Sequence, residues 1–282
     1  MTLAPRRRRP AQVALVLALL VAFPVLEAGS PAFATPSSRT PAASKGVHPV
    51  AAPTSDVLVT LSNLLARLLP SLSPAGPGVA PSLTSQVVAS TVRVNGVACG
   101  VRLAGSGFST APDTVVTNAH VVAGETTTSV LRPDGRTLPA TVQAFDPDRD
   151  LAVLSVPGLG EPSLALTPAA VGETDAIFGH PLGQAAITVT SARITRRLSI
   201  DIGNIYNESS GIRQILVMNT VLQPGDSGSP VVNSAGNVVG VAFASYSLAS
   251  STAFAVASEE LAQVMAQPRS GAVSTGPCLD EG

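Results

Sequence analysis

Short runs of aliphatic residues, separated by polar and turn-forming residues, fill the chain from about residue 86 onwards. The runs are rich in Val, Ile and Thr, with Gly, Pro, Asp and Asn between them, which is typical of β-strands joined by turns. We predict strands over 87–94, 103–108, 115–117, 140–145, 151–156, 176–178, 186–194, 212–221, 230–233, 238–244 and 253–256. Because these runs do not alternate with helical segments, the pattern favours an all-β sandwich or barrel.

One helix is expected after the last strand. Ser258 suits a helix N-cap, and Glu259 and Glu260 follow where the helix dipole favours acidic side chains. We expect this helix to end at about Gln267, before Pro268.

Residues 35–84 have a different composition and are expected to form a linker. The segment is rich in Pro, Ala, Ser and Thr, which favours extended, solvated chain. Within it, 56–69 has leucines at helical spacing, an Asp at its start and a Pro after its end, and predicts a short helix. This helix either packs on the following domain, packs on nothing, or binds a membrane surface or a partner.

The N-terminus has the three regions of a secretory signal peptide. A basic cluster over 6–9 precedes an aliphatic run over 11–26, and Ala32-Phe33-Ala34 offers a cleavage site after Ala34. The alternative is an uncleaved segment, 1–34, that acts as a single N-terminal membrane anchor. Either interpretation exports the rest of the chain, so we expect a secreted, periplasmic or cell-envelope protein.

Composition and charge narrow the function classes. Of the 282 residues 45% are hydrophobic but only 3% are aromatic, so the core is expected to consist of Val, Leu, Ala and Ile. The formal net charge is -1. That balance indicates neither a nucleic-acid partner nor an anionic membrane surface.

The chain has two cysteines, Cys99 and Cys278. In an oxidising compartment such a pair is expected to form a disulfide, the alternative being two buried free thiols. Neither cysteine has a second Cys or a His at ligand spacing, so no metal site is expected, and nothing else in the sequence calls for a cofactor.

Ser227 is a candidate nucleophile. Gly225 and Gly228 flank it and allow a tight turn that directs the amides of Gly225 and Ser227 toward one point. Such a pair of donors suits the oxyanion of a tetrahedral intermediate in acyl transfer. The alternative is an ordinary glycine-rich hairpin.

A serine nucleophile needs a histidine base and an acid that orients the base. His120 closely follows the predicted strand 115–117, where its side chain can project into a cleft; taken alone, such a histidine is more often structural. The acid is one of Asp146, Asp148 and Asp150. We select Asp150 because it adjoins a continuous apolar strand, and a buried carboxylate needs a partner such as His120.

Four short motifs occur in order along the chain: Gly105-Ser106-Gly107-Phe108, Thr117-Asn118-Ala119-His120-Val121-Val122, Asp146-Pro147 with Asp150-Leu151-Ala152-Val153-Leu154, and Gly225-Asp226-Ser227-Gly228. Together they resemble the trypsin-like serine proteases of the bacterial HtrA-related type, and the order His, Asp, Ser is that of the chymotrypsin class. The positions of the two cysteines also resemble those of the mycobacterial acid-resistance periplasmic serine proteases, which are tethered to a membrane.

The resemblance implies a serine endopeptidase domain over 85–282, with two packed antiparallel Greek-key β-barrels and a C-terminal helix. His120, Asp150 and Ser227 would form the catalytic triad and act through an acyl-enzyme intermediate on protein or peptide substrates. The amides of Gly225 and Ser227 would form the oxyanion hole. The pocket for the residue before the scissile bond would be lined by Leu222, Gln223, Pro224, Phe243, Ala244, Ser245 and Thr252. None of these is acidic, which favours a small or aliphatic residue over a basic one.

The sequence departs from these families in several ways. The residues after the final helix leave no room for the PDZ domain of HtrA-type proteins, so we expect a monomer without peptide-gated oligomeric regulation. The acid-resistance proteases have several transmembrane helices, where this chain has one apolar segment. No activation site is evident before Val87, so Asp226 is expected either to bond locally or to await cleavage in the linker. Ser229 replaces a second glycine found in many relatives, and His180 is expected to be structural.

Two other functions remain open from the residues alone. A non-catalytic binding protein on the same fold would not react with an active-site serine reagent. An esterase would carry its nucleophile on a strand-to-helix elbow, whereas Ser227 lies among strands.

Overall fold

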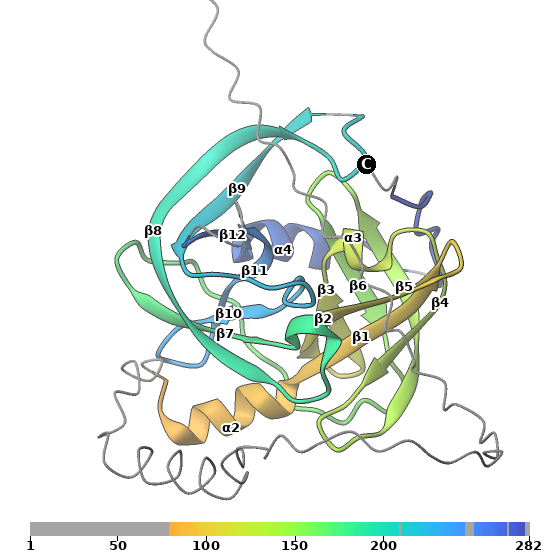
Figure 1. Ribbon diagram of the computed structural model, residues 1–282, viewed down its shortest axis with the longest axis horizontal. Coiled ribbons are helices and arrows are strands. Elements are labelled where there is room, and N and C mark those ends of the chain that lie inside the picture. Colours follow the sequence, from red (N-terminus) through yellow and green to blue (C-terminus); the bar gives the residue numbers. More distant parts are fainter. Residues whose placement is uncertain (1–78, 209, 246–250, 270, 280–282) are drawn as a thin grey trace, which may run out of the picture. The chain divides into compact units, whose positions relative to one another are not determined.

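The computed structural model describes residues 79–208, 210–245, 251–269 and 271–279, which all lie in one compact unit of the chain (Figure 1). The proposed signal peptide, 1–34, and the predicted helix at 56–69 lie outside the described residues. Twelve strands fall within the described part, which confirms the all-β prediction. Within these segments, none of the helices combines the length and apolarity needed to cross a membrane.

The first six strands form a closed antiparallel barrel. They are β1 (Thr91–Ala98), β2 (Val101–Ala111), β3 (Thr114–Thr117), β4 (Glu125–Leu131), β5 (Thr137–Asp146) and β6 (Leu151–Ser155). Their order is β1-β2-β3-β6-β5-β4, and the barrel closes because β4 pairs with β1. Its interior is filled by buried aliphatic residues such as Val92, Val94, Val115 and Leu154.

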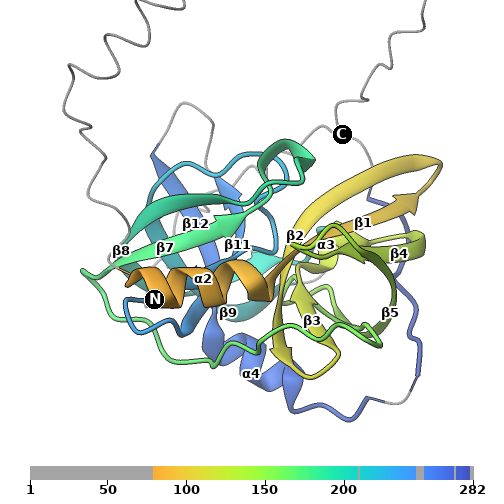
Figure 2. The ribbon, with the colours of Figure 1, turned by 90° about the horizontal axis from the view of Figure 1, so that it is seen from below.

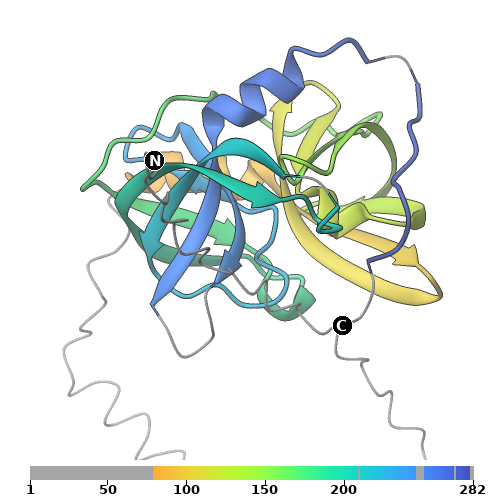
Figure 3. The same ribbon diagram turned by 90° about the horizontal axis from the view of Figure 1, so that it is seen from above.

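The last six strands form a second closed barrel. They are β7 (Thr174–Gly179), β8 (Thr188–Gly203), β9 (Ser210–Asn219), β10 (Pro230–Val232), β11 (Val238–Ser245) and β12 (Thr252–Ala257). Their order is β10-β11-β12-β9-β8-β7, with β7 paired to β10. Figure 3 shows the two barrels side by side, which confirms the chymotrypsin-like arrangement. A third cluster of buried residues, with members from both barrels such as Phe108, Leu151, Phe178 and Phe243, packs them together.

A helix, α2 (Pro81–Ser90), precedes the first barrel. The predicted strand at 87–94 is therefore wrong in its first four residues, which are helical. Strand β1 begins only at Thr91, and Figure 2 shows α2 leading directly into it. Pro81 stands at the start of the helix, where a missing N–H is tolerated. The hydroxyl of Thr91 donates to the Val87 carbonyl at 2.8 Å at the helix end. Val87 is buried against the barrels, and Val88 packs on the same cluster. These two valines, which the sequence placed in a strand, therefore pack as part of a helix.

The helix after the last strand, α4 (Ser258–Met265), is present where the sequence predicted one. The expected N-cap role of Ser258 is wrong, because Ala257 occupies that position and Ser258 is already helical. The Ser258 hydroxyl donates instead to the Thr167 carbonyl at 2.7 Å. This bond ties the helix to the segment that connects the two barrels.

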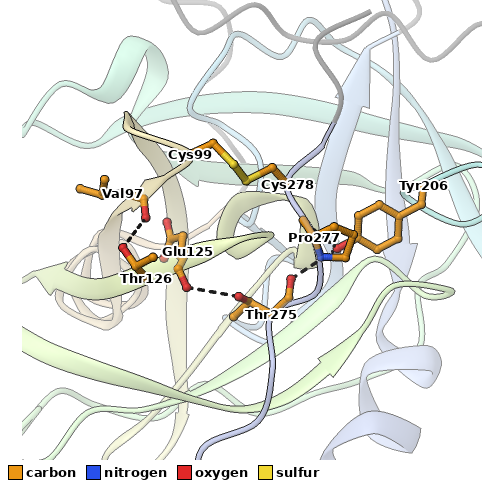
Figure 4. Close-up of a disulfide and its surroundings, with 8 residues drawn as sticks. All are labelled: Val97, Cys99, Glu125, Thr126, Tyr206, Thr275, Pro277 and Cys278. Atoms are coloured by element: carbon orange, nitrogen blue, oxygen red, sulfur yellow. Dashed lines mark hydrogen bonds between the residues drawn. A yellow bond between two sulfur atoms is a disulfide. The ribbon is translucent and has the colours of Figure 1, made fainter.

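The C-terminal segment returns to the first barrel and is attached there by a disulfide between Cys99 and Cys278 (Figure 4). The Gly124 amide donates to the Thr275 carbonyl at 3.0 Å. The Tyr206 hydroxyl, from the β8–β9 connection, donates to the Pro277 carbonyl at 3.1 Å. The bridge closes a sequence separation of 179 residues. In the chain-entropy model such a loop stabilises the fold by about 5 kcal/mol.

Glu125 lies under this attached segment, at the start of β4, and is 9% exposed. Burial disfavours the charged carboxylate and raises the pKa of Glu125 to about 7, and a hydrogen bond from the Thr128 hydroxyl partly opposes that shift. The folded protein therefore holds a proton on Glu125 that the unfolded chain releases at about pH 4.

This difference predicts a pH dependence of stability. The raised pKa adds about 3 kcal/mol to the free energy of unfolding below about pH 4. This contribution is lost as the pH rises from about 4 to about 7. Glu125→Gln removes the titrating group, so its free energy of unfolding is expected to fall less than that of the wild type between pH 4 and 8. Urea denaturation of both proteins across this range tests the difference. Parallel pH profiles would contradict the assignment.

Candidate active site

His120 lies at the start of the short helix α3 (Ala119–Val122), directly after β3. Its Nδ1 atom is 2.8 Å from Oδ2 of Asp150 and 3.0 Å from Oδ1. Its backbone N–H donates to Oδ1 of Asp150 at 3.0 Å. The His120 side chain is 25% exposed and that of Asp150 is 4% exposed. The pair therefore presents one ring edge to solvent and keeps its carboxylate in the interior.

Asp150 ends the turn between β5 and β6, with a φ of 56°. A non-glycine residue in this left-handed region costs about 1–2 kcal/mol, so the surroundings must hold it there. The Asn118 side chain donates to the Asp150 carbonyl at 2.8 Å, and the Arg149 amide donates to Asp146 at 2.8 Å within the turn. Asp146 is thus a turn residue, as its position before Pro147 predicted, and Asp148 is exposed.

Ser227 lies in the turn before β10, and this turn faces the first barrel. The Ser106 amide on β2 donates to the Ser227 carbonyl at 2.8 Å. Gly105 lies between Ser227 and Val121, which is the residue after His120. A Cβ on Gly105 would lie 2.7 Å from Cγ1 of Val121 and 3.2 Å from the Ser227 carbonyl oxygen. The structure thus brings the predicted nucleophile and base to the same place between the barrels.

The Ser227 hydroxyl donates to the Phe243 carbonyl at 3.4 Å, and no hydrogen bond joins these two described side chains, Ser227 and His120. Catalytic hydrogen bonds are often long or misaligned without substrate and shorten when it binds. In the present geometry the candidate acid therefore orients the candidate base, and the hydroxyl of the candidate nucleophile bonds to the Phe243 carbonyl.

The two predicted oxyanion donors are the amides of Gly225 and Ser227. The Leu182 amide donates to the Pro224 carbonyl at 2.5 Å. Because a trans peptide places its C=O and N–H on opposite sides, the Gly225 N–H points away from Leu182. Within the described residues, neither amide donates to a protein acceptor. Both donors are consequently available to a ligand oxygen.

Asp226, between them, bonds locally. The Gln223 amide donates to its Oδ2 atom at 2.8 Å. Burial raises the pKa of Asp226 to about 6, and the Gln223 hydrogen bond partly opposes that shift. Of the two alternatives for Asp226, local bonding or cleavage in the linker, the structure has local bonding.

The predicted pocket residues lie on the turn before Ser227, on β11 and at the start of β12: Leu222, Gln223, Pro224, Phe243, Ala244, Ser245 and Thr252. Leu222 and Phe243 are each 5% exposed. The Ser245 hydroxyl accepts from the Leu222 amide at 2.9 Å and so joins the turn to β11. Their role as a substrate pocket stays a prediction.

Of the other two histidines, His48 lies outside the described residues and His180 is buried. Its Nδ1 atom is 3.1 Å from the Gln184 carbonyl. Burial lowers the pKa of His180, which favours a neutral ring.

Arg213 is a feature of the site that the sequence analysis missed. It lies on β9, is 4% exposed, and donates from Nη1 to the Asp148 carbonyl at 2.7 Å. Its guanidinium stands 5.7 Å from the centroid of the Phe243 ring. Burial lowers the pKa of Arg213, whereas the charges of four carboxylates oppose that shift: Asp150, Asp146, Asp148 and Glu260. One side chain of the second barrel therefore holds the turn that carries Asp150.

We expect Arg213→Met to lower the free energy of unfolding by about 2 kcal/mol, because it removes the hydrogen bond of a charged donor to the Asp148 carbonyl. A matched control is Arg136→Met, which removes a surface arginine with a 65% exposed side chain that pairs with Asp134. Loss of that pair should cost less than about 1 kcal/mol. Urea denaturation at neutral pH measures both, and equal midpoints would rule out a stabilising role for the buried cation.

The comparisons with known proteins agree with this geometry. A model of the trypsin-like peptidase domain matches residues 105–241. The crystal structure of the active form of Rv3671c protease from M. tuberculosis is similar, with a TM-score of 0.68 and 31% identity over 88% of this chain and 100% of that one. This chain belongs to the trypsin-like serine peptidase family. Its members are hydrolases.

The whole Rv3671c protein and other relatives in this family match over smaller shares of their own length. Serine protease Rv3671c of Mycobacterium tuberculosis (strain H37Rv) is 34% identical over 236 residues, which is 79% of this chain and 59% of that protein. Serine protease Do-like HtrA of Lactobacillus helveticus is 35% identical over 133 residues, or 45% of this chain and 31% of that one. The structure of HtrA-type protease AlgW with a tripeptide has a TM-score of 0.58 and 26% identity, over 65% of this chain and 61% of that one. This chain thus spans 59% of the length of serine protease Rv3671c, and the match covers 79% of this chain.

Proposed function

We propose that this protein is an exported serine endopeptidase that cleaves protein or peptide substrates through the triad His120, Asp150 and Ser227. The observation that carries the proposal is the His120–Asp150 pair, with Nδ1 and Oδ2 2.8 Å apart, beside a serine turn with two available amides. The site lies between two barrels, where the family resemblance implies that the triad should be.

Each group has a defined role in the proposed reaction. His120 accepts the Ser227 proton at Nε2 as the hydroxyl oxygen attacks the scissile carbonyl, and Asp150 stabilises the imidazolium through Nδ1. The amides of Gly225 and Ser227 bind the oxyanion of the tetrahedral intermediate. His120 then gives its proton to the leaving amine, and water cleaves the acyl-enzyme by the same steps in reverse.

The proposal extends to location and organisation. Export rests on the signal-peptide pattern over 1–34, which either leaves the protein free or anchors it once in a membrane, with 35–84 as a linker and 85–282 as the peptidase domain. The absence of acidic side chains among the pocket residues supports cleavage after small or aliphatic residues. We expect the peptidase to act as a monomer and to need neither a metal nor an organic cofactor.

A fluorophosphonate probe, which reacts with activated serines, tests the function on the full chain. Labelling of the wild type and its loss in Ser227→Ala are expected. Ser229→Ala is a matched control, because Ser229 is a fully buried serine two residues away whose hydroxyl has no partner among the described residues. It should label like the wild type. A folded wild type that does not label would support a non-catalytic binding protein instead.

A further inference from the structure

Arg93 and Ser106 face each other across neighbouring strands of the first barrel. The register of β1 and β2 pairs them directly, so their side chains lie on the same face of the sheet. Both side chains bond to the second barrel. They reach the same loop, which follows β7 and contains the short 3₁₀ helix η1 (Pro181–Gly183).

Ser106 is fully buried, and its hydroxyl and amide both bond to the second barrel. Its hydroxyl donates to the Gly225 carbonyl at 2.7 Å and accepts from the His180 amide at 2.9 Å. Its amide donates to the Ser227 carbonyl, and its own carbonyl accepts from the Thr117 hydroxyl at 2.7 Å. One serine therefore joins the nucleophile turn, the loop after β7 and strand β3.

Arg93 holds the other end of that loop. Its Nη1 atom donates to the Gly183 carbonyl at 2.5 Å. Between the two attachments, the Leu182 amide donates to the Pro224 carbonyl at 2.5 Å. Leu182 has a φ of 56°, which a leucine adopts only when its surroundings enforce it.

These contacts fix the peptide groups on both sides of the Gly225 α-carbon. Arg93 holds the loop whose Leu182 amide bonds the Pro224 carbonyl, and Ser106 bonds the Gly225 carbonyl itself. The fit leaves little room: a Cβ on Gly225 would lie 2.5 Å from the His180 carbonyl oxygen and 2.9 Å from the Gly183 amide nitrogen. The direction of the Gly225 N–H is thus set from the first barrel.

We propose that Arg93 and Ser106 are positioning residues that orient the Gly225 amide of the oxyanion hole. They act across the interface between the barrels and touch no reacting atom. The inference rests on the proposed function, because the Gly225 amide matters only if an oxyanion forms beside Ser227. A merely structural pair would contribute to stability and leave the chemistry of folded protein unchanged.

The variants Ser106→Ala and Arg93→Met remove the two contacts. Each has a matched control on β2. Ser109→Ala removes another fully buried serine, whose hydroxyl, within the described part of the chain, bonds only to the Ala111 carbonyl, at 3.3 Å. Arg102→Met removes an exposed arginine. Ser106→Thr keeps a hydroxyl and serves as the conservative variant.

Three quantities are measured on folded full-length protein: the rate of fluorophosphonate labelling, the affinity for a small aliphatic peptide boronic acid, and the affinity for the same peptide with a methyl group in place of the boronic acid. The boronic acid forms a tetrahedral adduct with an oxygen in the oxyanion hole, whereas the methyl peptide has no oxygen at that point. A misplaced oxyanion donor should lower the first two by about 10²-fold in Ser106→Ala and less in Arg93→Met, with the affinity for the methyl peptide unchanged. Ser106→Thr should recover part of the loss, and both β2 controls should match the wild type.

The outcomes separate this inference from the proposed function. If Ser227→Ala labels as fast as the wild type, the proposed function fails and this inference fails with it. If labelling needs Ser227 but Ser106→Ala and Arg93→Met match their controls, the function stands and the inference is wrong. If Ser106→Ala does not fold, Arg93→Met against Arg102→Met decides: a selective loss of labelling and boronic-acid affinity supports the inference, and equal values overturn it.

Discussion

Asp150→Asn is expected to lower kcat for peptide hydrolysis about 10⁴-fold. Asp150 accepts hydrogen bonds from His120 at both its ring Nδ1–H and its backbone N–H. An asparagine presents an NH₂ group to one of these donors, which favours the imidazole tautomer with its proton on Nε2, where it cannot accept the Ser227 proton. KM should change little, because Asp150 lies behind the ring and is buried.

The matched control for this variant is Asp148→Asn, which makes the same change two residues earlier on the same turn. Asp148 is exposed, and its hydrogen bond with Arg213 uses the backbone carbonyl, which the substitution keeps. The substitution removes only its charge, which is one of four carboxylate charges that act on Arg213. Its kcat should remain within a few-fold of the wild type. Initial rates with a small aliphatic peptide substrate compare the two, and equal loss in both would show that Asp150 is not the acid of the triad.

Gly228→Ala is expected to have the largest effect on stability. Gly228 has a φ of 88°, and a Cβ there would lie 2.0 Å from the Ser106 carbonyl oxygen and 2.5 Å from the Thr117 hydroxyl. Backbone strain and the steric clash together should lower the free energy of unfolding by about 3 kcal/mol or more. Displacement of the turn should also abolish labelling of Ser227.

Gly135→Ala separates the strain from the clash. Gly135 has a φ of 85°, but a Cβ there would have no neighbour within 4 Å. This variant should lose only about 1–2 kcal/mol and keep its full labelling rate. Thermal and urea unfolding of both variants give the comparison, and an equal loss would mean that the close approach between Gly228 and β2 has no energetic consequence.

The strand pattern of the fold was predictable because most strands carry β-branched or apolar residues between turn signals. Strand β4 (Glu125–Leu131) was missed, since its run of threonines has little apolar alternation, yet it closes the first barrel. Helix α2 was misread because Val87 and Val88 lie next to the true strand β1. Local pattern does not show where a helix ends against a barrel formed by distant residues.

The candidate triad was predictable from short motifs, because each of its residues follows or precedes a strand in a local pattern. Arg213 and Arg93 were not, because each is an ordinary charged residue on a strand until the two barrels pack. The hydroxyl of Ser106 bonds to Gly225, 119 residues later in the chain. Such contacts depend on strand register and on the interface between the barrels, which no local pattern specifies.

The most direct test of the central claim is the capture of an acyl-enzyme on the full-length protein. An activated ester of a small aliphatic peptide is mixed with the protein, release of the leaving group is followed within the first turnover, and the acid-quenched protein is mapped by mass spectrometry. The account predicts a burst of one equivalent per chain and an acyl group on Ser227, absent from Ser227→Ala. Linear release with no adduct on a folded protein, or an adduct on another residue, would contradict it.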